Sequence, residues 1–149
     1  MAGLLDDDRL FPLAAPARNL ARKLYETVHD LPIISPHGHT DPRWFAENDN
    51  FSDPAHLLIV PDHYIFRMLF SQGVALEGLG IARAGGGAVE VDPRKIWKIF
   101  AGHYHLFRGT PTRLWLDHTF ATLFDLDRPL SASTADLYYD RIAERLAED

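Results

Sequence analysis

Residues 31–42 carry the sequence LPIISPHGHTDP, in which a short apolar run leads directly into two histidines. The run is short, is bracketed by prolines and contains the adjacent β-branched residues Ile33 and Ile34. Runs of this kind are typical of a strand that is buried on both faces. We therefore expect residues 31–35 to form a short buried strand that ends in a loop.

His37 and His39 follow this run and are separated by Gly38. If the backbone stays extended, side chains two residues apart share one face, so the two imidazoles can approach a common divalent ion. The chain has no cysteine, and any further ligands must therefore be nitrogen or oxygen atoms. The same residues can also form a polar turn whose histidines bond to backbone groups, and spacing alone leaves both interpretations open.

The sequence on either side of this stretch is helical in pattern. Residues 16–29 place apolar side chains at three- and four-residue steps between basic ones, with a proline near the first turn, as in an amphipathic helix. Residues 42–149 predict at least five helices and a glycine-rich loop over residues 78–87. Candidate N-terminal caps for these helices are Asp41, Asp53, Asp62, Asp92, Thr110 and either Ser133 or Thr134.

A second His-x-His pair, His103 and His105, lies within the helical pattern that begins at Asp92. A two-residue step on an α-helix rotates the side chain by about 200°. We therefore expect these two rings to diverge, with one at the edge of the core and the other on the surface.

Composition limits the classes of function. The chain has 149 residues, 46% of them apolar, and 15 basic against 21 acidic side chains give a net charge of −6. This charge has the wrong sign for general binding to phosphate backbones, so we expect no nucleic-acid partner. No apolar stretch is long enough for a signal peptide or a membrane span, which predicts a cytoplasmic protein without a membrane partner.

The motifs, taken in order, resemble the N-terminal region of the uronate isomerase (glucuronate isomerase) family of the amidohydrolase superfamily. The resemblance runs from about Arg18 to Phe124. It is carried by the early helix, the apolar run with its His-x-His and Asp-Pro pairs, DHY at 62–64 with Arg67, HLFRGTP at 105–111 and LWLDH at 114–118.

The resemblance implies a metal-dependent (β/α)8 TIM barrel, of which residues 1–149 are the N-terminal part. Residues 31–39 would be the first barrel strand and its metal loop, and residues 42–149 an inserted helical region. For this chain alone the expected fold is mostly α with one short strand.

The implied activity is the aldose–ketose isomerisation of hexuronates, such as D-glucuronate to D-fructuronate, and a homo-oligomer is expected. By resemblance, His37 and His39 bind a divalent metal, with zinc expected, while His63 and Tyr64 are catalytic and contact the hexuronate. Arg67 would help to hold the anionic substrate, although a solvated helix residue fits its position equally well. Without the family, His63 would be taken for a helix-cap histidine.

Two other functions remain open at this stage. A metal-dependent hydrolase of the same superfamily would share the His-x-His pair, but the 62–64 and 105–111 motifs argue against it. A non-catalytic helical interaction module would use the aromatic and leucine residues only as a core. Members of the uronate isomerase family are several hundred residues long and supply further ligands and arginines, so we expect this chain to be incomplete and inactive alone.

Overall fold

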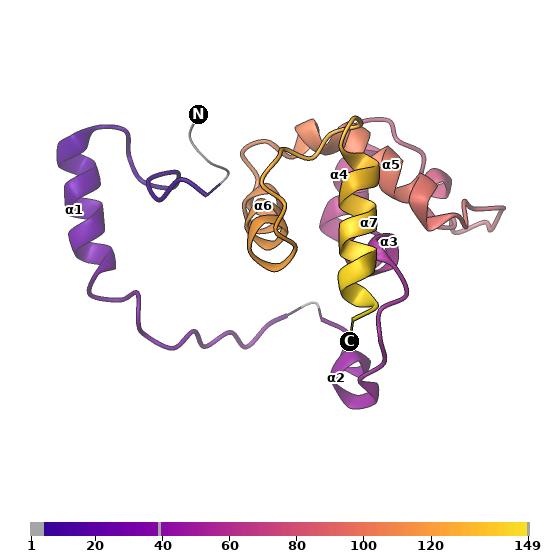
Figure 1. Cartoon of the computed structure of the whole chain (residues 1–149), viewed down its shortest axis with the longest axis horizontal. Helices are drawn as coiled ribbons and strands as arrows, with labels where there is room; N and C mark the ends of the chain where they lie inside the picture. The colour runs from indigo at the N-terminus through magenta and orange to yellow at the C-terminus, as the bar shows by residue number, and fades with distance from the viewer. Residues whose placement is uncertain (1–4, 39, 149) are drawn as a thin grey trace. The chain divides into compact units, whose positions relative to one another are not determined.

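The computed structural model describes residues 5–38 and 40–148, which form two compact units, one ending at Asp49 and the other beginning at Asn50. None of the helices within these residues is long and apolar enough to cross a membrane. The first unit contains α1 (Ala15–Tyr25) and α2 (Arg43–Glu47) (Figure 1). The second contains α3 (Pro54–Leu58), α4 (His63–Ser71), η1 (Leu76–Leu79), α5 (Pro93–His103), η2 (Tyr104–Phe107), α6 (Pro111–Leu123) and α7 (Ala135–Leu146), where η marks a 3₁₀ helix.

The helix starts in the second unit follow the predicted caps. The Asp53 carboxylate accepts hydrogen bonds from the N–H groups of Ala55 and His56, each at 2.9 Å, at the start of α3. Asp62, Asp92 and Thr110 cap α4, α5 and α6 in the same way. Thr134 precedes α7 but does not cap it, because its hydroxyl instead accepts a hydrogen bond from the N–H of Ser131 at 2.9 Å.

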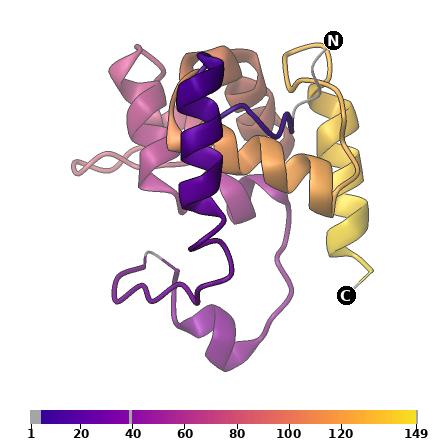
Figure 2. The same ribbon diagram turned by 90° about the vertical axis from the view of Figure 1, so that its left-hand side faces the viewer.

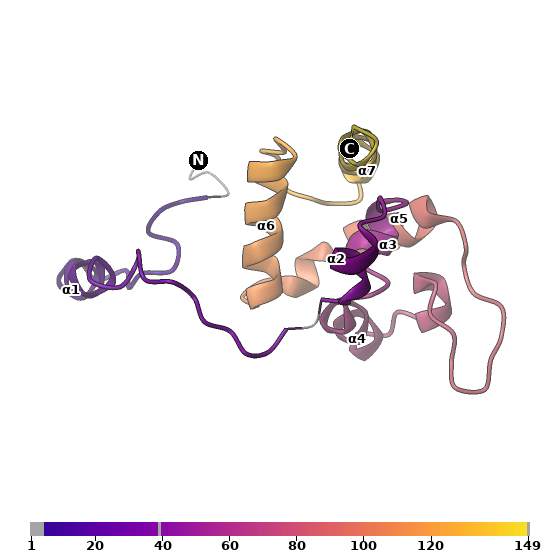
Figure 3. The same cartoon turned by 90° about the horizontal axis from the view of Figure 1, so that it is seen from below.

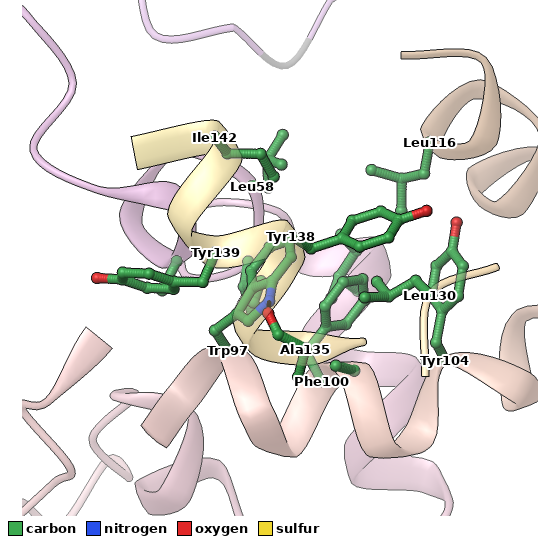
Figure 4. Packing of buried hydrophobic residues seen from close by; sticks show 14 of the residues in the cluster. Leu58, Trp97, Phe100, Tyr104, Leu116, Leu130, Ala135, Tyr138, Tyr139 and Ile142 are labelled. Atoms are coloured by element: carbon green, nitrogen blue, oxygen red, sulfur yellow. Dashed lines mark hydrogen bonds between the residues drawn. The ribbon is translucent and has the colours of Figure 1, made fainter. Parts of the chain in front are cut away.

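The core of the second unit is built around α5, which packs against α3, α7, η1 and η2 (Figures 1 and 3). Trp97 and Phe100 on α5 are fully buried, and the indole N–H of Trp97 donates to the carbonyl of Ala135 at 2.9 Å (Figure 4). Phe120 of α6 meets Tyr138 of α7 edge-on, with ring centroids 5.0 Å apart. These aromatic contacts join the helices of the second unit into one core.

The glycine-rich loop predicted over residues 78–87 overlaps the end of η1, and its residues from Gly80 onward follow that helix. Between η1 and α5 the chain forms a long loop without helix or strand (Figures 1 and 2). Gly86 and Gly87 within it have φ angles of 76° and 132°, a region that residues with a side chain rarely adopt.

The first unit has little core of its own. Helix α1 is amphipathic as predicted, yet none of its residues is buried. Phe11 packs edge-on against Tyr25 at 6.2 Å, the guanidinium of Arg22 lies 5.0 Å above the Phe11 ring, and Arg22 pairs with Asp8. These contacts leave the leucines of α1 exposed.

The strand expected over residues 31–35 is wrong for this chain. No residue in the described ranges 5–38 and 40–148 is in a strand, and the whole 31–35 segment is exposed, with Ile33 at 94% and Ile34 at 88%. A strand needs neighbouring strands to bond its backbone groups and to cover its apolar side chains. The described residues of the first unit supply neither, so the segment stays irregular. The mostly helical character of the chain is confirmed.

Candidate functional site

His63 and Tyr64 lie side by side in the first turn of α4. The Asp62 carboxylate accepts a hydrogen bond from the N–H of Tyr64 at 2.8 Å and so fixes where the helix begins. Ile65 and Leu69 are buried on the core side of α4, which leaves Tyr64 61% exposed. The rings of His63 and Tyr64 lie 4.3 Å apart at an interplanar angle of 31°. An imidazole and a phenol are therefore presented together on the outer side of α4.

The three residues that the resemblance assigns to the substrate line one hollow. His63, Tyr64 and Arg67 surround it together with Met68 and Ser71, and its volume is about 390 Å³. Arg67 is exposed, as both interpretations of it require. The structure thus brings an imidazole, a phenol and a guanidinium together on one surface.

A larger groove of about 530 Å³ adjoins this hollow through Tyr64 and Met68. Its other lining residues come from the end of η2 and the first turns of α6: Phe107, Thr110, Pro111, Thr112 and Trp115. The three sequence motifs at 62–67, 105–111 and 114–118 therefore meet at one surface. Sequence reasoning gave no site role to the last two, although the four-residue step from Pro111 to Trp115 predicts that both share a helix face.

A polar cluster of Tyr104, Arg113 and Asp117 joins η2 to α6. The hydroxyl of buried Tyr104 donates to the Asp117 carboxylate at 2.9 Å, and Nε of Arg113 donates to the same carboxylate at 2.7 Å. The Arg113 guanidinium also lies 4.0 Å above the Tyr104 ring. Burial, with a further contribution from the Asp117 charge, raises the pKa of Tyr104 well above its ordinary value. Tyr104 therefore stays a neutral donor at physiological pH.

His37 is exposed in the first unit, and the Ser35 hydroxyl donates to its backbone carbonyl at 2.8 Å. A Cβ added at Gly38 would meet no atom within 4 Å, so the backbone beside His37 is open. His39 lies outside the described residues, and the expected shared face of the two imidazoles stays a prediction.

A divalent metal fits this segment only in part. An imidazole is a suitable donor for a zinc-like ion, but a catalytic zinc takes three protein ligands. No group of three or more histidine, aspartate or glutamate side chains in the described part of the chain could hold a metal ion. Any complete site therefore needs ligands besides His37.

The expected divergence of His103 and His105 is wrong. Their rings are nearly parallel, at 24°, with centroids 6.4 Å apart. The reason is that α5 ends at His103 and η2 begins at Tyr104, so the two residues do not share a continuous α-helix. His103 is half-buried with its Nδ1 2.8 Å from the Ile99 carbonyl oxygen, and His105 is exposed, as the core-edge and surface assignment requires.

Comparison with known proteins identifies the family. The glucuronate isomerase family model matches residues 2–149, almost the whole chain. The chain belongs to the glucuronate isomerase family. The chain is 65% identical over 143 residues to a uronate isomerase of Mesorhizobium japonicum and 58% identical over 146 residues to one of Rhizobium meliloti.

Two solved structures agree with this assignment. A glucuronate isomerase from Caulobacter crescentus matches 96% of the chain with a TM-score of 0.84 and 54% identity. A uronate isomerase from Thermotoga maritima matches 97% with a TM-score of 0.76 and 25% identity. All four relatives carry isomerase names, which favours the isomerase hypothesis over a hydrolase. The chain spans about 30% of the relatives' own length: 30% and 31% of the first two and 30% and 29% of the solved chains.

Proposed function

We propose that this glucuronate isomerase family chain contributes one part of the active site of a uronate isomerase, which interconverts a hexuronate such as D-glucuronate and its 2-keto isomer D-fructuronate. The observation that carries the proposal is the meeting of the 62–67, 105–111 and 114–118 segments at one hollow and groove. The family match over residues 2–149 supports the same activity.

Aldose–ketose isomerisation moves a proton between C2 and C1 of the sugar, which requires a group to carry the proton and donors to stabilise the developing enediolate. We assign two tasks to His63 and Tyr64, whose rings lie 4.3 Å apart: they carry the proton, and they form hydrogen bonds with the sugar oxygens. Arg67 lines the same hollow and is assigned to the anionic substrate, because a guanidinium matches a carboxylate in charge and geometry.

His37 and His39 are proposed as two nitrogen ligands of a divalent metal, with zinc preferred. A metal held there would polarise the sugar oxygens. The remaining ligands are assigned to the part of the enzyme that this chain does not match. In the complete enzyme, residues 31–39 are proposed as the first strand and metal loop of a (β/α)8 barrel, since their apolar side chains suit a strand covered on both faces.

The exposed apolar residues of this chain also support the proposed homo-oligomer. A cytoplasmic location is proposed for this enzyme as well.

The proposal is tested with a hybrid enzyme in which this chain replaces the matching 30% of the Mesorhizobium japonicum uronate isomerase. We expect the hybrid to convert glucuronate, and Tyr64→Phe or His63→Ala to lower kcat at least tenfold. The exposed Tyr25 of α1 provides the matched control, and Tyr25→Phe should leave kcat unchanged. The proposal would be overturned if the hybrid folds but does not convert glucuronate. It would also be overturned if both Tyr64→Phe and His63→Ala keep the full kcat of the hybrid.

Arg67 is tested separately in the same hybrid. If it holds the substrate carboxylate, Arg67→Gln should raise KM at least fivefold with a smaller change in kcat, because uniform binding energy is lost. Arg145→Gln is the control, because Arg145 is an exposed arginine of α7 that pairs with Glu148. Equal KM values in the two variants would identify Arg67 as a solvated helix residue.

A further inference from the structure

Two rows of side chains run along the outer side of α4. His63, Arg67 and Ser71 are spaced four residues apart and form the first row. Tyr64 and Met68 have the same spacing and form the second, because side chains four residues apart lie on one face of an α-helix. The first row is polar and lines the hollow, whereas the second lines both the hollow and the larger groove. A molecule that fills both therefore has polar groups on one side and the walls of the groove on the other.

Trp115 is the largest side chain that lines the groove. It comes from α6, whose next residue, Leu116, is fully buried in the core, yet Trp115 itself is 42% exposed. Met68, Phe107 and Pro111 line the same groove, so most of its wall is apolar. Apolar and aromatic walls with a few placed polar groups are typical of sites for small molecules.

The polar cluster that joins η2 to α6 holds the α6 side of the groove in place. Arg113 and Asp117 flank Trp115 in the sequence, and Nε of Arg113 donates to the Asp117 carboxylate at 2.7 Å. A second N–H of Arg113 donates to the backbone carbonyl of Tyr104 at 3.3 Å. The wall that carries Trp115 is therefore fixed before a ligand arrives, which lowers the entropic cost of binding.

A hexuronate has the two kinds of surface that these walls match. Its hydroxyls and carboxylate form hydrogen bonds and ion pairs, which suits the polar row on α4. Its C–H groups are apolar and carry partial positive charge, so they pack well against the negative face of an aromatic ring. A purely apolar ligand would leave the polar row without partners, and the loss of water from those groups would oppose binding.

We propose that Trp115 is a substrate-contacting residue of the isomerase, whose indole packs against the C–H groups of the hexuronate while His63 and Arg67 hold its oxygen atoms. The inference deepens the proposed function and rests on it, because that function identifies the ligand. The indole carries no titrating proton, so its contact stabilises the bound sugar and the transition state alike. Such uniform binding appears in KM and not in kcat.

The test measures the binding and turnover of glucuronate in the hybrid with the Mesorhizobium japonicum enzyme. Trp115→Ala should raise both the Kd, measured by titration calorimetry, and the KM about tenfold, with a change in kcat below about threefold. Trp115→Phe keeps an aromatic face and should recover most of the affinity. Leu114→Ala is the matched control, because Leu114 precedes Trp115 on α6, is 37% exposed and does not line the groove.

Tryptophan fluorescence separates a contact with the sugar from a purely structural role. Trp97 is fully buried and Trp44 lies in the first unit, so Trp115 is the tryptophan of this chain that lines the groove. Saturating glucuronate should change the emission of the hybrid, and this change should be smaller in Trp115→Phe, which still binds. The circular dichroism of all three variants should match that of the unmodified hybrid.

Binding and turnover are scored separately. Unchanged Kd and KM in Trp115→Ala, an equal rise in Leu114→Ala, or a loss confined to kcat would each overturn the inference, even if the unmodified hybrid converts glucuronate. A hybrid that binds glucuronate through Trp115 without converting it sustains the inference, and the proposed function alone fails. A folded hybrid that neither binds nor converts glucuronate overturns both.

Discussion

Tyr104 contributes a single hydroxyl to the polar cluster that joins η2 to α6. Tyr104 is fully buried, and its hydroxyl donates a hydrogen bond to the Asp117 carboxylate at 2.9 Å. Tyr104→Phe removes this donor and leaves the ring packing in place, so we expect a loss of about 1.5 kcal/mol in the free energy of unfolding, measured by urea titration. Tyr25→Phe, at a tyrosine that is 56% exposed, should change it by less than about 0.5 kcal/mol. Equal losses in the two variants would contradict a stabilising role of this hydroxyl.

The buried tyrosines also make stability depend on alkaline pH. Burial, with a smaller contribution from the neighbouring Asp117 charge, raises the pKa of Tyr138 to about 12. In the unfolded chain a tyrosine ionises near pH 10, so above that pH the unfolded state loses a proton that the folded state keeps. The contribution of Tyr138 to the free energy of unfolding is therefore fully present below pH 10. It is lost as the pH rises toward 12, by at most about 1.4 kcal/mol per pH unit.

Urea titrations between pH 8 and pH 11 measure this dependence. The free energy of unfolding of the wild-type chain should fall above pH 10, and more steeply than that of the Tyr138→Phe variant. Identical slopes for the two chains would show that Tyr138 ionises alike in the folded and unfolded states.

At the scale of single elements, the N-terminal caps were the most reliable sequence signals. A cap is a local interaction, because Asp53 bonds to N–H groups two and three residues along the chain and needs no tertiary contact. The same holds at Asp62 and Asp92, and the helices that they start were predicted correctly. Thr134 shows the limit, since its hydroxyl bonds to Ser131 and Pro129 instead of capping α7.

The Asp53 cap gives a direct stability prediction. Asp53→Ala removes both bonds to the start of α3 and should cost about 1 kcal/mol of unfolding free energy. Asp49→Ala, at an exposed aspartate outside any helix, serves as the control and should cost less than about 0.5 kcal/mol. Thermal or urea unfolding of both variants measures the difference, and a stable Asp53→Ala chain would mean that the cap contributes nothing.

The strand was predicted wrongly for a non-local reason, and the divergence of the second histidine pair was predicted wrongly because a local end of the α-helix was missed. Residues 31–35 have the composition of a buried strand, but strand formation depends on backbone partners that are not found among residues 5–38 and 40–49 of the first unit. The break between α5 and η2 falls directly after Gly102 and His103, and glycine is one of the residues that often end a helical pattern. The prediction did not use this glycine and extended the α-helix past the residue at which it ends.

At the scale of the whole molecule, the site could be assigned from sequence only through its ordered motifs. Composition and helical period place His63, Tyr64 and Arg67 on α4, yet they do not show that Phe107 and Trp115 line the adjoining groove. That grouping depends on the packing of α4 against η2, a contact between residues about forty positions apart, which local patterns do not encode.

The chain alone is expected to be inactive. The described residues offer no cluster of three metal ligands, and a catalytic zinc needs that number from the protein. Purified 149-residue chain with added zinc or manganese should therefore give no measurable glucuronate turnover while it keeps its helical circular dichroism. Turnover that Tyr64→Phe abolishes would show that the chain already contains a complete site.

The most direct test of the account is glucuronate turnover and bound metal in the hybrid with the Mesorhizobium japonicum enzyme, measured for two histidine variants. His37→Ala should lose both the metal and at least a hundredfold in kcat, because one metal ligand is removed. His103→Ala, at a histidine whose ring nitrogen contacts the Ile99 carbonyl, should keep both. A His37→Ala hybrid that retains metal and full turnover would contradict the assignment of a uronate isomerase metal site to this chain.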